Sequence, residues 1–165
     1  MLDVKPFQET LNAGMCGPAS LKIVLGYYGL EKSEKELSEL TENDSDLGTT
    51  AENIKKAAEQ LGFMVEIKNN CDFADIENWL DKNVPVIVDW FTRGRNDYVE
   101  EIAAADGHYS VVAGLDEKYI YLQDPEIGEM RKMEKETFKK VWFDFEGKYI
   151  QPDELIIRQI IAVFQ

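Results

Sequence analysis

Three side chains of this sequence have the chemical types that a cysteine hydrolase needs. Cys16 opens the segment Cys-Gly-Pro-Ala-Ser-Leu, and His108, the single histidine, stands in Gly-His-Tyr-Ser-Val-Val. Asp124 follows sixteen positions after the histidine, in Gln-Asp-Pro. If the three groups meet in space, they form a thiolate nucleophile, an imidazole base and a carboxylate that orients the imidazole.

The segment that begins at Cys16 is predicted to be a helix. Apolar residues recur at the helical period from Leu21 to Tyr28, and Gly29 ends the run. Pro18 fits the first turn, where its missing N–H is not needed. Cys16 is therefore expected at a helix N-terminus, whose N–H groups and partial positive charge favour a thiolate.

His108 and Asp124 are expected on the two strands of one hairpin. Residues 109–115 and 118–123 alternate as strands do, with a turn around Asp116. A turn centred on Asp116 places residues 108 and 124 directly opposite each other, where side chains share a face of the sheet. Asp124 would then fix the tautomer and the ring orientation of His108.

Acyl transfer also requires hydrogen-bond donors for the oxyanion. The backbone N–H of Cys16 is one candidate donor. A side-chain amide upstream, from Gln8 or Asn12, is expected to be the second.

The remaining pattern predicts an α+β fold in one domain, residues 1–165, with a helical lobe packed on a mostly antiparallel sheet. The lobe carries Cys16, and the sheet carries His108 and Asp124. Further helices are predicted at 33–40, 50–61, 72–82 and 135–142, and further strands at 63–67, 84–90, 129–133 and 157–164. An extended arm is expected over 1–15 and a surface loop over 92–106.

Composition excludes several classes of function. A net charge of −14 repels phosphate backbones and anionic lipids, so nucleic acid is not an expected partner. The apolar runs are too short to span a bilayer, no secretion signal opens the chain, and two cysteines do not make a disulfide scaffold. We expect a cytoplasmic protein with no cofactor and, with one histidine, no metal site.

The motifs together resemble those of a known family. Gln8, then Cys16-Gly-Pro-Ala-Ser-Leu, Gly107-His108-Tyr109 and Gln123-Asp124-Pro125 with Gly128 are similar to the bacteriocin-processing (double-glycine leader) peptidases, which are papain-like cysteine peptidases. The resemblance covers roughly residues 5–145. It implies a papain-like fold with Cys16 as nucleophile, His108 as base, Asp124 as orienter and Gln8 as oxyanion donor.

This family resemblance also implies a peptide or protein substrate with a small residue, such as glycine, before the cleaved bond. Two features depart from the family: the gap between Gln8 and Cys16 is longer than usual, and this chain contains no membrane segment and no P-loop. Removal of a leader coupled to export therefore does not carry over.

Two other functions fit the same residues. The triad could transfer an acyl group to an amine instead of water, or the domain could bind peptides without catalysis. Cys71 lacks a comparable setting and is expected to be incidental. The basic cluster Arg93-Gly94-Arg95 is expected to lie in a solvated loop, with the alternative that it holds a substrate carboxylate.

Overall fold

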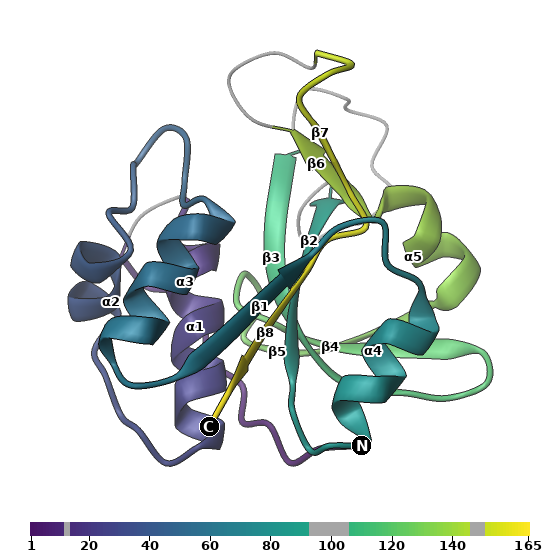
Figure 1. Cartoon of the computed structure of the whole chain (residues 1–165), viewed down its shortest axis with the longest axis horizontal. Coiled ribbons are helices and arrows are strands. Elements are labelled where there is room, and N and C mark those ends of the chain that lie inside the picture. Colours follow the sequence, from purple (N-terminus) through teal and green to yellow (C-terminus); the bar gives the residue numbers. More distant parts are fainter. Residues whose placement is uncertain (12–13, 93–105, 146–150) are drawn as a thin grey trace.

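The helical lobe forms one side of the molecule (Figure 1). The computed structural model describes residues 1–11, 14–92, 106–145 and 151–165. The lobe consists of α1 (Cys16–Tyr27), α2 (Glu34–Leu40) and α3 (Ala51–Gln60). The three helices that the sequence predicts here are confirmed.

Side-chain caps explain where α2 and α3 begin. Ser33 and Glu36 form a reciprocal capping box at the start of α2. The Thr50 side chain accepts a hydrogen bond from Asn53 N at the start of α3. Both caps stand at the helix starts that the sequence predicts.

A six-stranded sheet lies next to the lobe, in the order β1-β8-β2-β3-β4-β5. Each neighbouring pair is antiparallel. The strands are β1 (Met64–Lys68), β2 (Val86–Thr92), β3 (Asp106–Leu115), β4 (Tyr119–Asp124), β5 (Glu129–Glu134) and β8 (Ile160–Phe164). The expected α+β class with a mostly antiparallel sheet is confirmed.

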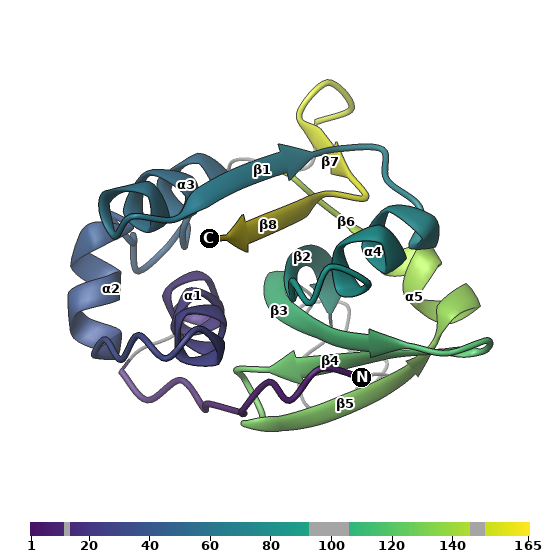
Figure 2. The same cartoon turned by 60° about the horizontal axis from the view of Figure 1, so that its bottom comes forward.

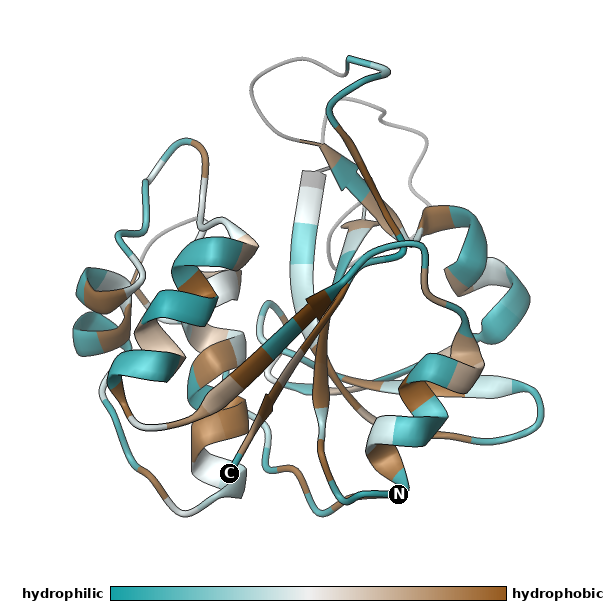
Figure 3. Cartoon of the chain, in the orientation of Figure 1, coloured by the Kyte–Doolittle hydropathy of each residue, from teal (hydrophilic) through white to brown (hydrophobic). Residues whose placement is uncertain are grey.

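Helices cover both faces of this sheet (Figure 2). The lobe packs on one face, and α4 (Phe73–Leu80) and α5 (Lys135–Val141) pack on the other. Each face has its own apolar core, one around Leu25 and Ile87 and one around Trp90 and Phe138. Apolar residues accordingly colour much of β2 and β8 in the sheet and of α1 in the lobe (Figure 3).

A small second sheet, β6 (Phe143–Phe145) with β7 (Leu155–Ile157), lies at one end of β2 and β3. The sequence did not predict it. The strand expected over 157–164 is confirmed as β8, but it begins only at Ile160, because Arg158 has a positive φ of 46° and separates Ile157, the last residue of β7, from β8.

The predicted register of the β3–β4 hairpin is wrong by two residues. Leu115 lies opposite Ile120, but beyond a β-bulge at Ala113 the pairs continue to Val111 opposite Gln123. If this register is continued by one pair, Ser110, and not residue 108, stands opposite Asp124. The turn lies farther along than expected, since Asp116 N donates to Tyr119 O and the Asp116 side chain accepts from Lys118 N and Tyr119 N.

The N-terminal arm is extended, as predicted, and is bonded to this hairpin. Leu2 N donates to Ala113 O at 2.7 Å, so the bulged residue of β3 has a partner outside the sheet. The Gln123 side chain donates to Val4 O at 2.7 Å. The arm thus follows β3 and β4 toward the end of the hairpin that carries Asp124. No helix within the described ranges is both long enough and apolar enough to cross a membrane.

Candidate active site

Cys16 is the first residue of α1, and its side chain is half-buried. The residue before it, Met15, makes no side-chain capping bond, and the first turn contains no acidic side chain. The N–H groups of this turn are therefore not occupied by a cap, and the positive end of the helix stabilises an anion at Cys16. This is the position that the sequence predicts.

His108 lies on β3 and is 6% exposed. Its Nε2 is 2.6 Å from Asp124 Oδ1, and Cys16 is close enough to the ring to raise its pKa. Because Asp124 occupies Nε2, Nδ1 is the nitrogen left for the thiol. The ring packs steeply inclined to the Trp90 ring, with an interplanar angle of 68° and the two centroids 5.7 Å apart. The structure therefore brings the three predicted residues together.

These contacts set the charge of the ring. Burial lowers the pKa of His108, but the hydrogen bond to Asp124, the nearby Cys16 and the charges of both groups outweigh burial and raise that pKa well above its usual value. The imidazolium is consequently favoured at neutral pH. An imidazolium next to a cysteine favours the thiolate that acyl transfer requires.

Asp124 is held by three donors. Its Oδ1 accepts from His108 and from Glu126 N at 3.0 Å, and its Oδ2 accepts from Arg131 Nε at 2.7 Å. Burial raises the pKa of Asp124, but the hydrogen bond to His108 and the His108 and Arg131 charges lower it below the usual value. The carboxylate is therefore ionised, and its plane is fixed from both oxygens.

Gln8 lies on the arm above the turn that follows Asp124. Its Nε2 donates to Glu126 O at 3.2 Å, and the side chain rests on Gly128, whose φ is +69°. An added Cβ on Gly128 would collide with Gln8. Asn12, the other predicted amide donor, and the Arg93-Gly94-Arg95 cluster lie outside the described residues.

Sequence reasoning missed Arg131, which is 7% exposed on β5. A signal for it exists: Arg131 and Met133 alternate with exposed neighbours, so the arginine stands at an inward position of its strand. A charge at such a position indicates a buried ion pair.

Sequence reasoning also missed two neighbouring carboxyls beside the site, of which Asp89 is buried. Asp89 on β2 is 1% exposed, stands opposite Tyr109, and lies near the half-buried Asp144 carboxyl of β6, which raises its pKa. Asp144 lies where a Cβ on Gly107 would stand, so the glycine before His108 is required for this contact. The signal was an acid inside the otherwise apolar strand of 84–90.

We expect Asp89→Asn to stabilise the protein at alkaline pH. Burial first, and then the neighbouring Asp144, raise the pKa of Asp89 well above its usual value, with Cys16 adding to the shift and His108 opposing it. A raised carboxyl pKa means that stability is complete below the unfolded pKa of about 3.9 and declines as pH rises through the folded pKa.

Asparagine cannot ionise and can donate permanently to Asp144. The melting temperature of Asp89→Asn should match the parent near pH 4 and exceed it by roughly 3 °C or more at pH 8, since ~1 kcal/mol moves Tm by ~2–4 °C in a domain of this size. Thermal melts across pH measure this. If the melting temperatures of the two proteins depend on pH in the same way, the expectation is contradicted.

Cys71 is fully buried, and its Sγ is 3.3 Å from Lys68 O. Burial raises its pKa to about 11. It has no contact with the site, in agreement with the expectation that it is incidental. Both cysteines of the chain are free thiols.

Within the part of the chain that the structure describes, one group of metal-ligating side chains gathers: His108, Asp124 and Glu126 offer atoms within 4.8 Å of one another. His108 Nε2 and Asp124 Oδ1 are already bonded to each other. We therefore treat the group as part of the His–Asp pair.

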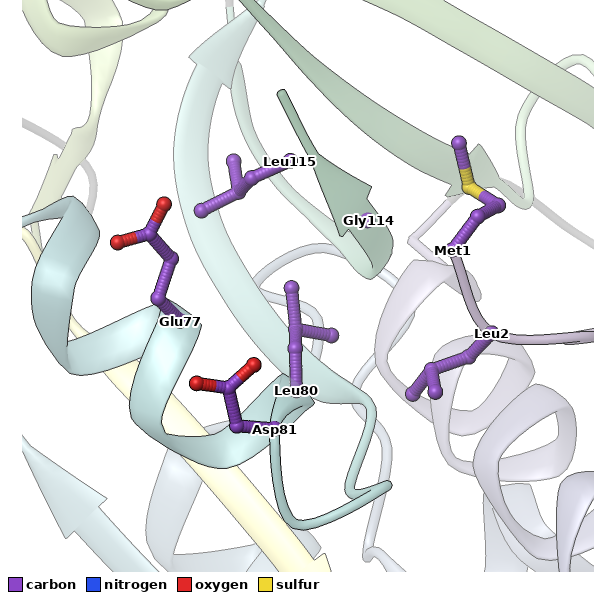
Figure 4. A pocket seen from close by; sticks show the side chains of 7 residues that line it. All are labelled: Met1, Leu2, Glu77, Leu80, Asp81, Gly114 and Leu115. Atoms are coloured by element: carbon purple, nitrogen blue, oxygen red, sulfur yellow. The ribbon is translucent and has the colours of Figure 1, made fainter. Parts of the chain in front are cut away.

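A hollow of about 310 Å³ lies at the other end of β3 (Figure 4). Gly114 and Leu115 of β3, Leu80 of α4 and Met1 of the arm line it. Gly114 is six residues from His108 along the strand, roughly 20 Å at ~3.3 Å per residue. This hollow is therefore separate from the candidate active site.

The family model for "Peptidase C39 family" matches residues 6–145. The chain belongs to this family. This C39 peptidase has the papain-like fold and the cysteine peptidase chemistry that the sequence motifs imply, and the resemblance stated from the motifs is confirmed.

Curated relatives of this C39 peptidase are mostly much longer. The transport/processing ATP-binding protein ComA of Streptococcus pneumoniae is 33% identical over 129 residues, which are 77% of this chain and 16% of ComA. The lactococcin-G-processing and transport ATP-binding protein LagD of Lactococcus lactis is 33% identical over 127 residues, with the same coverages. An uncharacterized protein of Methanothermobacter marburgensis is 29% identical, over 77% of this chain and 75% of its own.

Solved structures match nearly the whole chain. The peptidase domain of Streptococcus ComA is 26% identical with a TM-score of 0.71, covering 98% of both chains. A double glycine motif protease from an AMS/PCAT transporter, solved in complex with the leader peptide, has the same fold at a TM-score of 0.65 and 21% identity, covering 99% of this chain and 96% of that one.

Proposed function

We propose that this peptidase cleaves a peptide bond with Cys16 as nucleophile, His108 as acid and base, Asp124 as orienter and Gln8 as oxyanion donor. The observation that carries the proposal is the position of the His108 ring between Cys16, which raises the pKa of the ring, and the Asp124 carboxylate, 2.6 Å from Nε2. Cys16 stands at a helix N-terminus, where an anion is stabilised.

Each bond change has a residue to serve it. The Cys16 thiolate attacks the carbonyl carbon, and the oxyanion accepts from Cys16 N–H and Gln8. The His108 imidazolium then protonates the departing amine, leaving a thioester on Cys16 and a neutral ring. The ring next takes a proton from water as the hydroxide attacks the thioester. The tetrahedral intermediate then expels the Cys16 thiolate and releases the acid, which restores the thiolate–imidazolium pair.

The proposed role of Gln8 as oxyanion donor depends on where the backbone of the N-terminal arm holds its side chain. Its amide nitrogen has two hydrogens, and the Glu126 carbonyl occupies one. The arm that carries it is also anchored by Glu9 N on Pro125 O and by Thr10, whose N and Oγ1 both donate to the buried Glu34 carboxylate. These anchors keep Gln8 close to the turn that follows Asp124.

Gly128→Ala is expected to lower kcat/KM by displacing Gln8, up to the ~10²–10³-fold that loss of one oxyanion donor costs. The matched control is Gly62→Ala, because Gly62 also has a positive φ but no atom near its Cβ position. Gly128→Ala should lose more stability because of the collision, so activities are compared at a temperature where both variants are folded, and there only Gly128→Ala should lose activity. Equal activity in the two would remove the support for Gln8.

The proposed substrate is a peptide with a double-glycine or other small-residue pair before the cleaved bond. Two names support it: LagD is a lactococcin-G-processing protein, and the AMS/PCAT enzyme is a double glycine motif protease seen with its leader peptide. We further propose that residues 1–165 act as one domain in a reducing compartment such as the cytoplasm. The two free thiols support this location.

The test is cleavage of labelled peptides that contain Gly-Gly, Gly-Ala or Gly-Ser before a reporter. The parent and Cys71→Ala should release the reporter, and Cys16→Ala should not. Added hydroxylamine or glycinamide distinguishes acyl transfer, since a transferase forms the amine adduct in preference to the acid. Cleavage by Cys16→Ala, or no cleavage together with equally slow alkylation of both cysteines, would overturn the proposal.

A further inference from the structure

The carboxylate that orients His108 is itself held by a buried cation. Arg131 lies on β5 opposite Leu122, and its Nε donates to Asp124 Oδ2 at 2.7 Å. The Arg131 side chain is 7% exposed and the Asp124 side chain is 0% exposed. Two full charges therefore meet where water cannot screen them, and such pairs interact far more strongly than surface pairs.

Arg131 also contacts the ring that packs on His108. Its guanidinium carbon is 5.6 Å from the centre of the Trp90 ring, and the Trp90 ring in turn packs on the His108 ring. The Trp90 Nε1 donates to Ser110 Oγ at 3.1 Å, which fixes the indole. The guanidinium is thus held by a rigid aromatic surface as well as by the carboxylate.

The four groups alternate in charge when the thiol is ionised: Cys16 negative, His108 positive, Asp124 negative and Arg131 positive. Without Arg131, the three remaining groups carry a net negative charge in a buried site. Two further acids, Glu9 of the arm and Glu126 of the turn, face the same carboxylate. They repel an ionised Asp124, and Arg131 opposes them.

We propose that Arg131 is a positioning residue of the peptidase site, which fixes the plane and the charge of Asp124 so that Asp124 accepts from His108 Nε2. This inference rests on the proposed function. Arg131 does not touch the reacting atoms; it acts through Asp124. Burial raises the pKa of Asp124, and the His108 contacts together with the Arg131 charge bring it below the usual value.

The test compares Arg131→Met, Arg131→Lys and the control Lys132→Met. Lys132 is the exposed neighbour on the same strand, so its variant removes the same charge without touching Asp124. The first readout is the rate of Cys16 alkylation by iodoacetamide between pH 4 and 9, with Cys71 as internal reference. It requires no substrate and is normalised to the folded fraction from circular dichroism.

In Arg131→Met the pH below which Cys16 alkylation slows should move up, by no more than the ~1–3 pH units by which loss of an opposite charge raises the pKa of a neighbouring carboxyl. Arg131→Lys should reverse most of this shift, and Lys132→Met should not produce it. If folded Arg131→Met shows the same pH dependence of Cys16 alkylation as the parent, the inference is overturned, because an arginine with a purely structural role does not alter that pH dependence.

A second readout asks whether Arg131 acts through Asp124. The Asp124→Asn/Arg131→Met double variant should cleave peptide no more slowly than Asp124→Asn alone. A further multiplied loss would count against the inference. If instead Cys16→Ala still cleaves, the proposed function itself fails, whatever the arginine variants do.

Discussion

The His108→Ala variant is expected to lose about 10²–10⁴-fold in peptidase rate, because the single histidine both accepts and donates the proton in this site. The variant should also lose the fast reaction of Cys16 with iodoacetamide at pH 6, since no imidazolium remains beside the thiolate. Mass spectrometry of the two cysteine peptides measures both thiols in one sample. Cys71 should react slowly in both proteins, because burial raises its pKa to about 11.

The control for His108→Ala is rescue by added imidazole, which can enter the space that the missing ring leaves. Partial recovery of cleavage would show that the ring, and not the fold, was lost. Rapid alkylation of Cys16 in the alanine variant would mean that the helix N-terminus alone activates the thiol. This result would contradict the role of His108 in the proposed mechanism.

The Cys16 half of the site could be predicted from local sequence. The cysteine, Pro18 and the apolar repeat lie within one helix, and the start of that helix follows from neighbouring residues. The caps at Ser33 and Thr50 are local in the same way. Helix starts and caps depend on residues only a few positions apart, so they can be predicted from a single sequence.

The His108–Asp124 contact was predicted for a reason that is only partly correct. Continued from the turn without the bulge at Ala113, the pairing would place Val111 opposite Asp124, and His108 would then project from the other face of the sheet. The bulge removes that mismatch and leaves His108 diagonal to Asp124 on a shared face, within reach of a long side chain. The extra residue is bonded to Leu2 of the arm, a partner that the hairpin sequence does not reveal.

The Arg131 and Asp89 contacts depend on the sheet order and on β6, which the sequence did not predict. Arg131 reaches Asp124 because β5 pairs with β4, and Asp144 reaches Asp89 because β6 packs on β2 and β3. Each residue was visible as a charge at an inward strand position. Its partner became visible only with the fold.

Asp124→Asn is expected to lower turnover by roughly 10²–10⁴-fold while leaving the protein folded. Asp124 accepts from three donors through two oxygens, and asparagine has only one oxygen. The charged Arg131 should take that oxygen and turn the amide nitrogen toward His108. His108 Nε2 must then accept, so the proton moves to Nδ1, and the ring can no longer take a proton from Cys16.

The measurement is kcat/KM across pH, with a thermal melt on the same sample. A folded variant with a large loss of kcat and little change in KM indicates the wrong tautomer, since the Asp124 side chain is fully buried. If the melting temperature of Asp124→Asn is instead below the assay temperature, the loss of activity reflects unfolding, and Asp124 is a structural residue. Near-parental turnover in a folded variant would mean that the amide oxygen stays on His108, and that the Arg131 contact is weaker than the bond from Glu126 N.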